Sequence, residues 1–256
     1  YPIFTEALSQ SKISVGPPFF NIIIIPIVVP FLILMAIAPK SSWIKNNFKN
    51  YIPFLLILLA SIILNILIIY FFRPYSVLTS LIIISAIFLI LYSFIDLINS
   101  LKNKNLLDNA RIISHLGFGL LVFFIGINHN FSIEKDFNLK QGEKKIFEKY
   151  SVNFKMLKLE ERENYKAVIG IFDIQNLKNS KIETLEPEIR IYSKPQTLTY
   201  EASIKTKLNH DLYLTMSNVN RSDFYNIKFQ EKPFMIWIWL SALLITIGGF
   251  IRVLKK

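Results

Sequence analysis

The chain has 256 residues, of which 52% are hydrophobic and only 18% are charged, and it contains no cysteine. This composition is too apolar for an ordinary soluble protein of this size. The lack of cysteine excludes disulfides, thiolate metal sites and any haem attached covalently to this chain through a CxxCH motif. The formal charge of +11 would indicate a nucleic-acid partner only if it formed a basic stripe on a soluble face.

Five hydrophobic runs reach or approach the length of ~20 residues that a helix needs to cross a bilayer. They cover residues 19–38, 51–72, 76–98, 112–128 and 234–251. Pro26 and Pro30 interrupt the first run, which predicts a kinked helix packed against other helices. We therefore expect an integral membrane protein with an α-helical transmembrane bundle of about five spans.

Basic residues near the predicted spans are concentrated on alternate connections, and such residues are retained on the cytoplasmic side of short loops. Those on one side are Lys40, Lys45, Lys49, Lys102, Lys104, Arg111, Arg252, Lys255 and Lys256. Only Lys12 and Arg73 lie on the other side. Five spans with the N-terminal segment outside then place residues 131–232 outside the cytoplasm. This stretch carries 18 basic against 15 acidic residues, so most of the net charge reflects topology and no nucleic-acid partner is expected.

Beyond Asn128 the hydrophobic pattern changes from helical to twofold, which is typical of strands with one apolar face. The alternating stretches lie at residues 150–156, 165–171 and 198–204, with shorter candidates at 189–192, 212–216 and 225–229. About six short strands predict an antiparallel sandwich or open barrel, a small all-β domain inserted before the last span. His210, beside Asp211 at a predicted strand entry, is interpreted as a solvated turn residue.

The predicted organisation has four parts. They are an extracytoplasmic segment at 1–18, four transmembrane helices in 19–130, an extracytoplasmic β-rich domain at 131–232, and a last transmembrane helix with a cytoplasmic tail at 233–256. Because the sequence starts at Tyr1 rather than at a methionine, we expect it to be the C-terminal part of a longer protein.

His115 is the most informative residue, because it lies near the start of a hydrophobic run that is otherwise free of ionisable groups. At about 100° per residue, Gly119, Val122 and Gly126 project from the same helix face, which has little side-chain bulk. A macrocycle lying along the helix would need such room below a coordinating imidazole, and neutral imidazole is a common axial ligand of haem iron. Arg111, one turn earlier, would then pair with a propionate.

Three other interpretations of the membrane part stay open. The simplest is a core histidine bonded to a neighbouring helix, with the glycines serving close helix packing. A second is a di-haem electron-transfer subunit, because His129 lies 14 residues beyond His115, or ~21 Å along one helix. A third is a haem transporter or permease subunit, although paired charges within the spans are missing. Asp96 is interpreted as an interfacial residue near Lys102.

Short motifs occur along the whole chain in a fixed order and spacing. They are Ser14-Val15-Gly16-Pro17-Pro18-Phe19-Phe20-Asn21, Ser114-His115-Leu116-Gly117, Asn164-Tyr165, Pro187-Glu188 with Arg190 and Tyr192, Tyr200-Glu201-Ala202, Asp211-Leu212-Tyr213, Lys232-Pro233-Phe234, Trp237-Ile238-Trp239 and Gly248-Gly249. With these motifs the chain resembles the C-terminal part of the CcmF family, the haem-handling membrane subunits of cytochrome c maturation. Arg162-Glu163 departs from the family's usual Gly-Pro, and Ile189 stands where a basic residue is common.

The resemblance implies that His115 is the axial ligand of a membrane b-type haem, that is, a ligand of the haem iron. It also implies a part in a haem lyase (cytochrome c synthetase) that reduces haem and transfers it to apocytochrome c, and this part is not expected to be active alone. The implied partners are a haem chaperone, apocytochrome c, other cytochrome c maturation subunits and quinol. The implied location is the bacterial or mitochondrial inner membrane, in contact with lipid. The family's tryptophan-rich segment and second membrane histidine are absent from this sequence, so a complete haem site is expected to need further residues.

Overall fold

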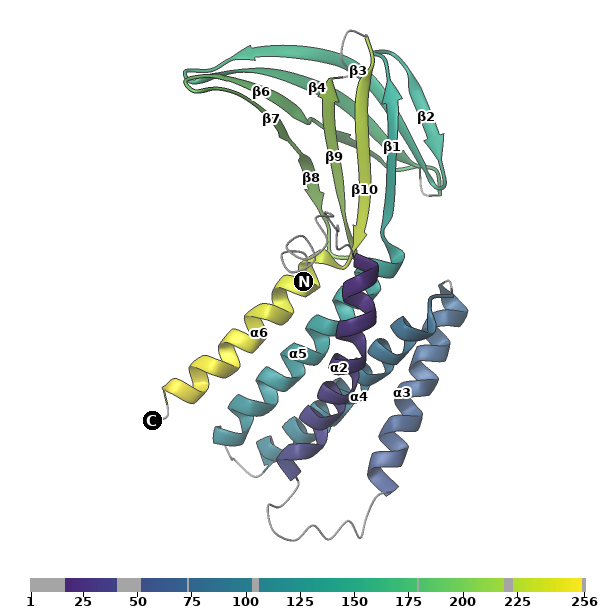
Figure 1. Ribbon diagram of the computed structural model, residues 1–256, viewed down its shortest axis with the longest axis vertical. Coiled ribbons are helices and arrows are strands. Elements are labelled where there is room, and N and C mark those ends of the chain that lie inside the picture. Colours follow the sequence, from purple (N-terminus) through teal and green to yellow (C-terminus); the bar gives the residue numbers. More distant parts are fainter. Residues whose placement is uncertain are drawn as a thin grey trace, which may run out of the picture. The chain divides into compact units, whose positions relative to one another are not determined.

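The computed structural model describes residues 17–40, 52–72, 74–102, 106–178, 180–218 and 223–254. Residues 1–16 of the predicted N-terminal segment lie outside the described residues. The same holds for part of the charge pattern: Lys45, Lys49, Arg73, Lys104, Lys255 and Lys256. The chain divides into a helical unit, Tyr1–Gly126 with Trp237–Lys256, and a strand unit, Ile127–Ile236. Both units can be followed in Figure 1.

Among the described residues, five long helices form where the sequence predicts spans. They are α2 (Pro17–Ile37), α3 (Ile52–Phe71), α4 (Val77–Lys102), α5 (Leu106–Phe131) and α6 (Met235–Val253), with the short 3₁₀ helix η1 (Ala38–Lys40) after α2. Four of them, α3 to α6, are long and apolar enough to cross a bilayer, and α2 continues as an apolar helix through Pro26 and Pro30. The prediction of a multi-pass helical membrane protein is therefore confirmed, and α5 is longer at both ends than its hydrophobic run.

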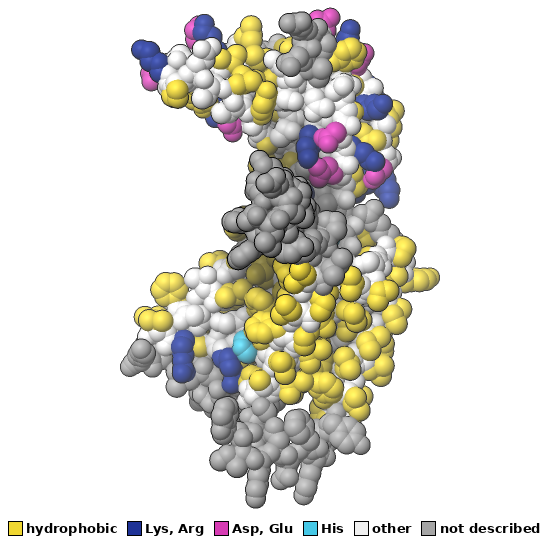
Figure 2. All heavy atoms as spheres, in the orientation of Figure 1, with side chains coloured by type: hydrophobic (Ala, Val, Ile, Leu, Met, Phe, Trp, Pro, Cys, Tyr) yellow, Lys and Arg dark blue, Asp and Glu magenta, His cyan; other side chains and the backbone are white. Residues whose placement is uncertain are grey.

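The helical unit packs around α4, which is the most buried of the four candidate spans at 39%, against 11% for α3 and α6. A core of fully or nearly fully buried side chains joins α2 to α4: Leu32, Ala36, Ala86, Phe88 and Leu89. Partly buried residues of α3 and α5 pack against this core. On the face shown in Figure 2, most side chains of the helical unit are hydrophobic. Such a surface is suited to lipid.

The strand unit contains ten strands within its described residues, arranged in two antiparallel sheets. The strands are β1 (Ile133–Leu139), β2 (Lys144–Phe147), β3 (Tyr150–Glu161), β4 (Tyr165–Asn176), β5 (Ile182–Leu185), β6 (Glu188–Ser193), β7 (Gln196–Glu201), β8 (Ser203–Thr206), β9 (His210–Asn218) and β10 (Tyr225–Pro233). The four-stranded sheet has the order β1-β10-β9-β8. The six-stranded sheet has the order β2-β3-β4-β6-β7, with β5 paired to β4.

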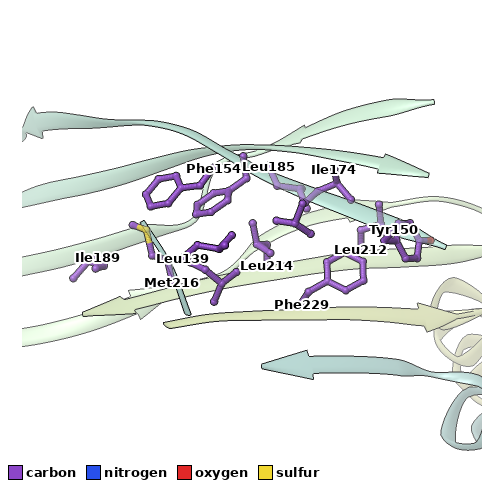
Figure 3. Close-up of a cluster of buried hydrophobic side chains, with 13 residues drawn as sticks. Leu139, Tyr150, Phe154, Ile174, Leu185, Ile189, Leu212, Leu214, Met216 and Phe229 are labelled. Carbon is purple, nitrogen blue, oxygen red and sulfur yellow. The ribbon is translucent and has the colours of Figure 1, made fainter. Parts of the chain in front are cut away.

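Apolar side chains from both sheets meet in one core, drawn in Figure 3. The rings of Phe154 and Phe172 stack with their centroids 4.3 Å apart, and Tyr150 lies 4.9 Å from Phe229 across the two sheets. A Cβ atom at Gly170 would lie 2.7 Å from the sulfur of Met216, so this glycine lets the sheets approach closely. The predicted all-β domain is confirmed, and it is a sandwich.

The strand predictions differ from the structure in two ways. The stretch 198–204, expected as one strand, breaks at Ala202, because β7 belongs to one sheet and β8 to the other. Strands β1, β2 and β5 were not predicted. Strands β2 and β5 are short and show no alternation, and in β1 the apolar face formed by Ile133, Phe137 and Leu139 is interrupted by Lys135. The interpretation of His210 as a solvated turn residue is wrong: it begins β9, pairs with Pro233 and is half-buried.

Candidate functional site

His115 lies where α5 meets α2 and α4. Its imidazole faces the backbone of Met35 on α2, and the charged groups near enough to act on it are Arg111 on α5 and Asp96 on α4. His115 is half-buried and Arg111 is exposed. In Figure 2 a histidine side chain reaches the surface of the helical unit next to basic side chains. The structure thus brings His115 and Arg111 together, as the sequence predicts.

Gly119 and Gly126 do not line open space in this structure. A Cβ atom at Gly119 would lie 3.0 Å from Cγ1 of Ile90, and one at Gly126 would lie 3.4 Å from Cγ1 of Ile83, both on α4. The expectation that these glycines leave room for a macrocycle is therefore corrected, because α4 occupies the space beside them. The contacts favour close helix packing through small residues, the alternative that the sequence left open.

The residues on either side of His115 fix α5 against α6. A Cβ atom at Gly117 would lie 2.9 Å from the backbone nitrogen of Ile245, and Ser114 donates a hydrogen bond of 3.4 Å to the carbonyl of the same residue. Gly248 packs against Ser114 from the α6 side. The Ser114-His115-Leu116-Gly117 motif is thus built so that its small residues set the rotation of α5, and that rotation directs His115 towards α2.

The donor atoms at this place suit one kind of metal site. The described residues contain no group of three or more His, Asp or Glu side chains that could hold a metal ion, so a closed site for a free ion is not formed by them. A single imidazole could serve as one protein ligand of a haem iron, because the porphyrin would supply most of the other donors. His129, in contrast, is exposed near the far end of α5.

In the strand unit, several of the motif residues gather around Arg190 on the outward face of the six-stranded sheet. The Arg190 guanidinium lies 2.7 Å from the Glu188 carboxylate and 3.9 Å from that of Glu201, and its carbon is 5.0 Å from the centre of the Tyr165 ring. Tyr165 in turn contacts Tyr192, with ring centres 5.2 Å apart. The hydrogen bond that Arg190 donates to the Glu188 carboxylate raises the pKa of Arg190. These motifs therefore meet in one ionic and aromatic cluster that ties β4, β6 and β7 together.

A second cluster, at the end of the strand unit where β9 begins, was not found from the sequence. Lys149 pairs with the buried carboxylate of Glu231 at 2.8 Å, and Lys207 pairs with Glu183 at 2.8 Å. His210 lines a small cavity beside this second pair. Burial lowers the pKa of His210, and so do the nearby lysines, against an opposing effect of Glu231. The members of this cluster come from four separate stretches of the chain, and no local spacing signals them.

Comparisons with known proteins identify the relationship. Residues 130–233 match the family model described as the CcmF C-terminal beta-sandwich. The whole chain is 26% identical to the cytochrome c-type biogenesis protein CcmF of Pseudomonas aeruginosa, covering 40% of that protein, and 98% of it aligns at 25% identity with 39% of the Escherichia coli protein of the same name. Residues 130–233 thus match a CcmF C-terminal beta-sandwich, and the chain as a whole is similar to the C-terminal part of CcmF. It spans about two fifths of the length of the curated relatives that it matches.

The fold of this part of CcmF is also seen in a solved structure. A protein named Cytochrome c Heme Lyase CcmF superposes on 98% of this chain with a TM-score of 0.74, at 18% sequence identity and over 41% of that protein. The shared fold includes both the helices and the β-sandwich. The CcmF motif residues around Arg190 and in the α5–α6 contact are thus explained by the packing of this fold.

Proposed function

We propose that this chain acts in cytochrome c maturation as the C-terminal part of a haem lyase subunit, and that His115 supplies one axial ligand to a membrane b-type haem. Similarity over 98–100% of the chain to proteins named for cytochrome c-type biogenesis supports the first statement. The observation that carries the second is the placement of His115, a half-buried imidazole on a span that is otherwise free of ionisable groups for more than three turns. An ionisable residue within a span is a functional candidate by default.

The surroundings of His115 prepare the imidazole for this role. The Met35 backbone lies beside one side of the ring, and a hydrogen bond donated by one ring nitrogen to a backbone carbonyl would orient the ring and leave the other nitrogen to a metal. Ser114 and Gly117 hold the rotation of α5 through α6. Arg111, exposed one turn earlier, would pair with a propionate. When bound, the haem supplies one-electron redox chemistry, which in this proposal keeps the haem delivered to apocytochrome c reduced.

The proposed location is the inner membrane, with residues 131–232 outside the cytoplasm. The distribution of lysine and arginine supports this orientation. In that arrangement the strand unit meets the haem chaperone, apocytochrome c or another maturation subunit, and quinol is the electron donor. A reporter enzyme fused after Lys256 should then be active only in the cytoplasm, and an external signal would rule out the five-span orientation.

The ligand role is tested by His115→Ala in the full-length protein. We expect loss of the membrane b-type haem spectrum and of cytochrome c maturation, with the protein still present in the membrane. His129→Ala is the matched control, since it removes a histidine from the same helix, and it should keep one haem per protein. A normal spectrum in His115→Ala would refute the proposal, and two haems in the wild type with one lost in His129→Ala would favour the di-haem alternative.

A further inference from the structure

We infer that the outer edge of β3 binds an extended polypeptide, which adds to the six-stranded sheet as a further strand. Strand β3 runs from Tyr150 to Glu161, but β2 pairs only with its first four residues, up to Asn153. The loop before β2 then bonds to Phe154. Within the described residues, the remainder of β3 pairs on one side only, with β4. Figure 1 shows β3 and β4 continuing well beyond the short β2.

The backbone groups that point away from β4 can be assigned from the register. Arg162 donates its N–H to the carbonyl of Tyr165 at 2.9 Å, and hydrogen-bonded pairs alternate with non-bonded pairs along an antiparallel ladder. Leu157, Leu159 and Glu161 therefore hold the non-bonded positions opposite β4, and their N–H and C=O groups point outward. Each of the three offers one donor and one acceptor at the spacing of a strand.

The β4 side of the ladder agrees with this assignment. Gly170 is the register partner of Leu157, yet its N–H bonds at 3.0 Å to the carbonyl of Pro187, on the side away from β3. The Leu157–Gly170 pair is thus a non-bonded pair, as the alternation requires. The outward groups of Leu157 have no hydrogen-bond partner among the residues that the structure describes.

The side chains on the inner face beside this edge are apolar: Leu157 is partly buried against the core, and Leu159 beyond it is exposed. Leu157 and Leu159 share the inner face of the sheet with Val168, and Leu159 is 78% exposed. The same face continues across the sheet through Ile191 and Leu198, which are 42% and 47% exposed. Its charged members near the edge, Glu161 and Lys166, neutralise each other at 2.9 Å. An exposed apolar edge of this kind is normally protected or paired.

These features define the chemistry of the occupant. Outward N–H and C=O groups in strand register are recognised by the main chain of an extended polypeptide, and pockets or faces for alternate side chains add selectivity. Because the inner face is apolar and carries no net charge, it selects a segment with uncharged, apolar side chains at every second position. The inference goes beyond the proposed function, since it requires no haem and depends on the strand unit alone.

The test uses the full-length protein in lipid nanodiscs and a fluorescent peptide of about eight residues that alternates valine and threonine, a length that covers the free edge at ~3.4 Å per residue. We expect saturable binding by fluorescence anisotropy. The same peptide with N-methyl groups on alternate amides should not bind, because it cannot donate to the edge.

Variants of one exposed position separate backbone from side-chain recognition. Leu159→Pro removes an outward N–H that makes no bond to β4, a position where proline is tolerated in an edge strand. Leu159→Lys keeps the N–H and places a charge on the inner face. Both should weaken peptide binding by about tenfold or more, which corresponds to the loss of one or two hydrogen bonds or of an apolar contact. Met156→Lys is the matched control, because Met156 is 49% exposed on the opposite face, and it should bind as the wild type does.

Several outcomes would overturn the inference. They are no binding by the wild type, unchanged binding by Leu159→Lys, or equal loss in Met156→Lys. Dimerisation of the wild type that is abolished by Leu159→Pro would also overturn it, by showing that a second copy occupies the edge. Circular dichroism of each variant confirms that the sandwich is folded, and Leu159→Lys keeps the test valid if Leu159→Pro does not fold.

Discussion

The interactions that stabilise the helical unit internally differ from those that stabilise the strand unit internally. The helices approach each other through small residues, with Gly117 and Gly248 at the α5–α6 contact and Gly119 at the α4–α5 contact. The strand unit instead buries large rings between two sheets and collects charged clusters at its edges. In lipid, apolar surface gains little from burial and backbone approach dominates, whereas in water burial of apolar area is the main driving force. A substitution should therefore act by clash in one unit and by cavity formation in the other.

The largest effect is expected from a cavity in the sandwich. Phe172→Ala removes a fully buried ring that stacks on Phe154, and it should reduce the free energy of unfolding of the strand unit by about 3–5 kcal/mol. Amide hydrogen exchange of the sandwich strands measures this loss. Leu159→Ala replaces an exposed leucine, and it should change the free energy of unfolding of the strand unit by less than about 0.5 kcal/mol. Equal protection in wild type and Phe172→Ala would show that this ring does not stabilise the fold.

A smaller effect is expected from a clash in the helical unit. A Cβ atom at Gly248 would lie 2.7 Å from the carbonyl oxygen of Ala110, whereas none of the described atoms lies within 4 Å of the corresponding position at Gly249. Gly248→Leu should lower stability by about 1–3 kcal/mol through overpacking, and Gly249→Leu should be close to neutral. The melting temperature of the purified protein in detergent reports the difference. A similar loss in both variants would contradict the α5–α6 contact.

The smallest expected effect is on how the stability of the strand unit depends on pH. Burial lowers the pKa of His210 below the value of 6.5 that it has when unfolded, so the folded state binds fewer protons than the unfolded state in this range. Stability from this group is complete above pH 6.5 and is lost as pH falls below it. In His210→Gln, the hydrogen-exchange protection of the β9 amides should depend less on pH between pH 7.5 and 5.5 than it does in the wild type. This pH range lies above the one in which the carboxylates titrate. An unchanged slope in His210→Gln would assign the effect to another group.

The helices and the central strands were accessible from the sequence because each carries a strong periodic signal. Long apolar runs predicted α3, α4 and α6, and alternation predicted β3 and β4. The outer strands β1 and β2 were missed. Most side chains of β2 are exposed, and in β1 the charged residue Lys135 interrupts the row of apolar residues that packs on the core. The crossing at Ala202 was missed as well, because an exposed alternating stretch does not reveal that its two halves pair with different sheets.

Only part of the candidate site could be predicted from the sequence. An isolated histidine in a span is visible in the sequence, and Arg111 follows from helical spacing. The role of Gly119 could not be predicted from the sequence. A row of glycines on one helix face is compatible with an open groove and with close helix contact, and the position of Ile90 in the structure distinguishes the two. The cluster around His210 depends on sheet register, which a single sequence does not contain.

The central claim is that His115 binds haem iron, and chemical rescue tests it most directly. His115→Gly in the full-length protein should lose the reduced-minus-oxidised b-type difference spectrum, and added imidazole should restore it by filling the vacated ligand position. His129→Gly should show the wild-type spectrum without imidazole. An unaltered spectrum in His115→Gly would contradict the account.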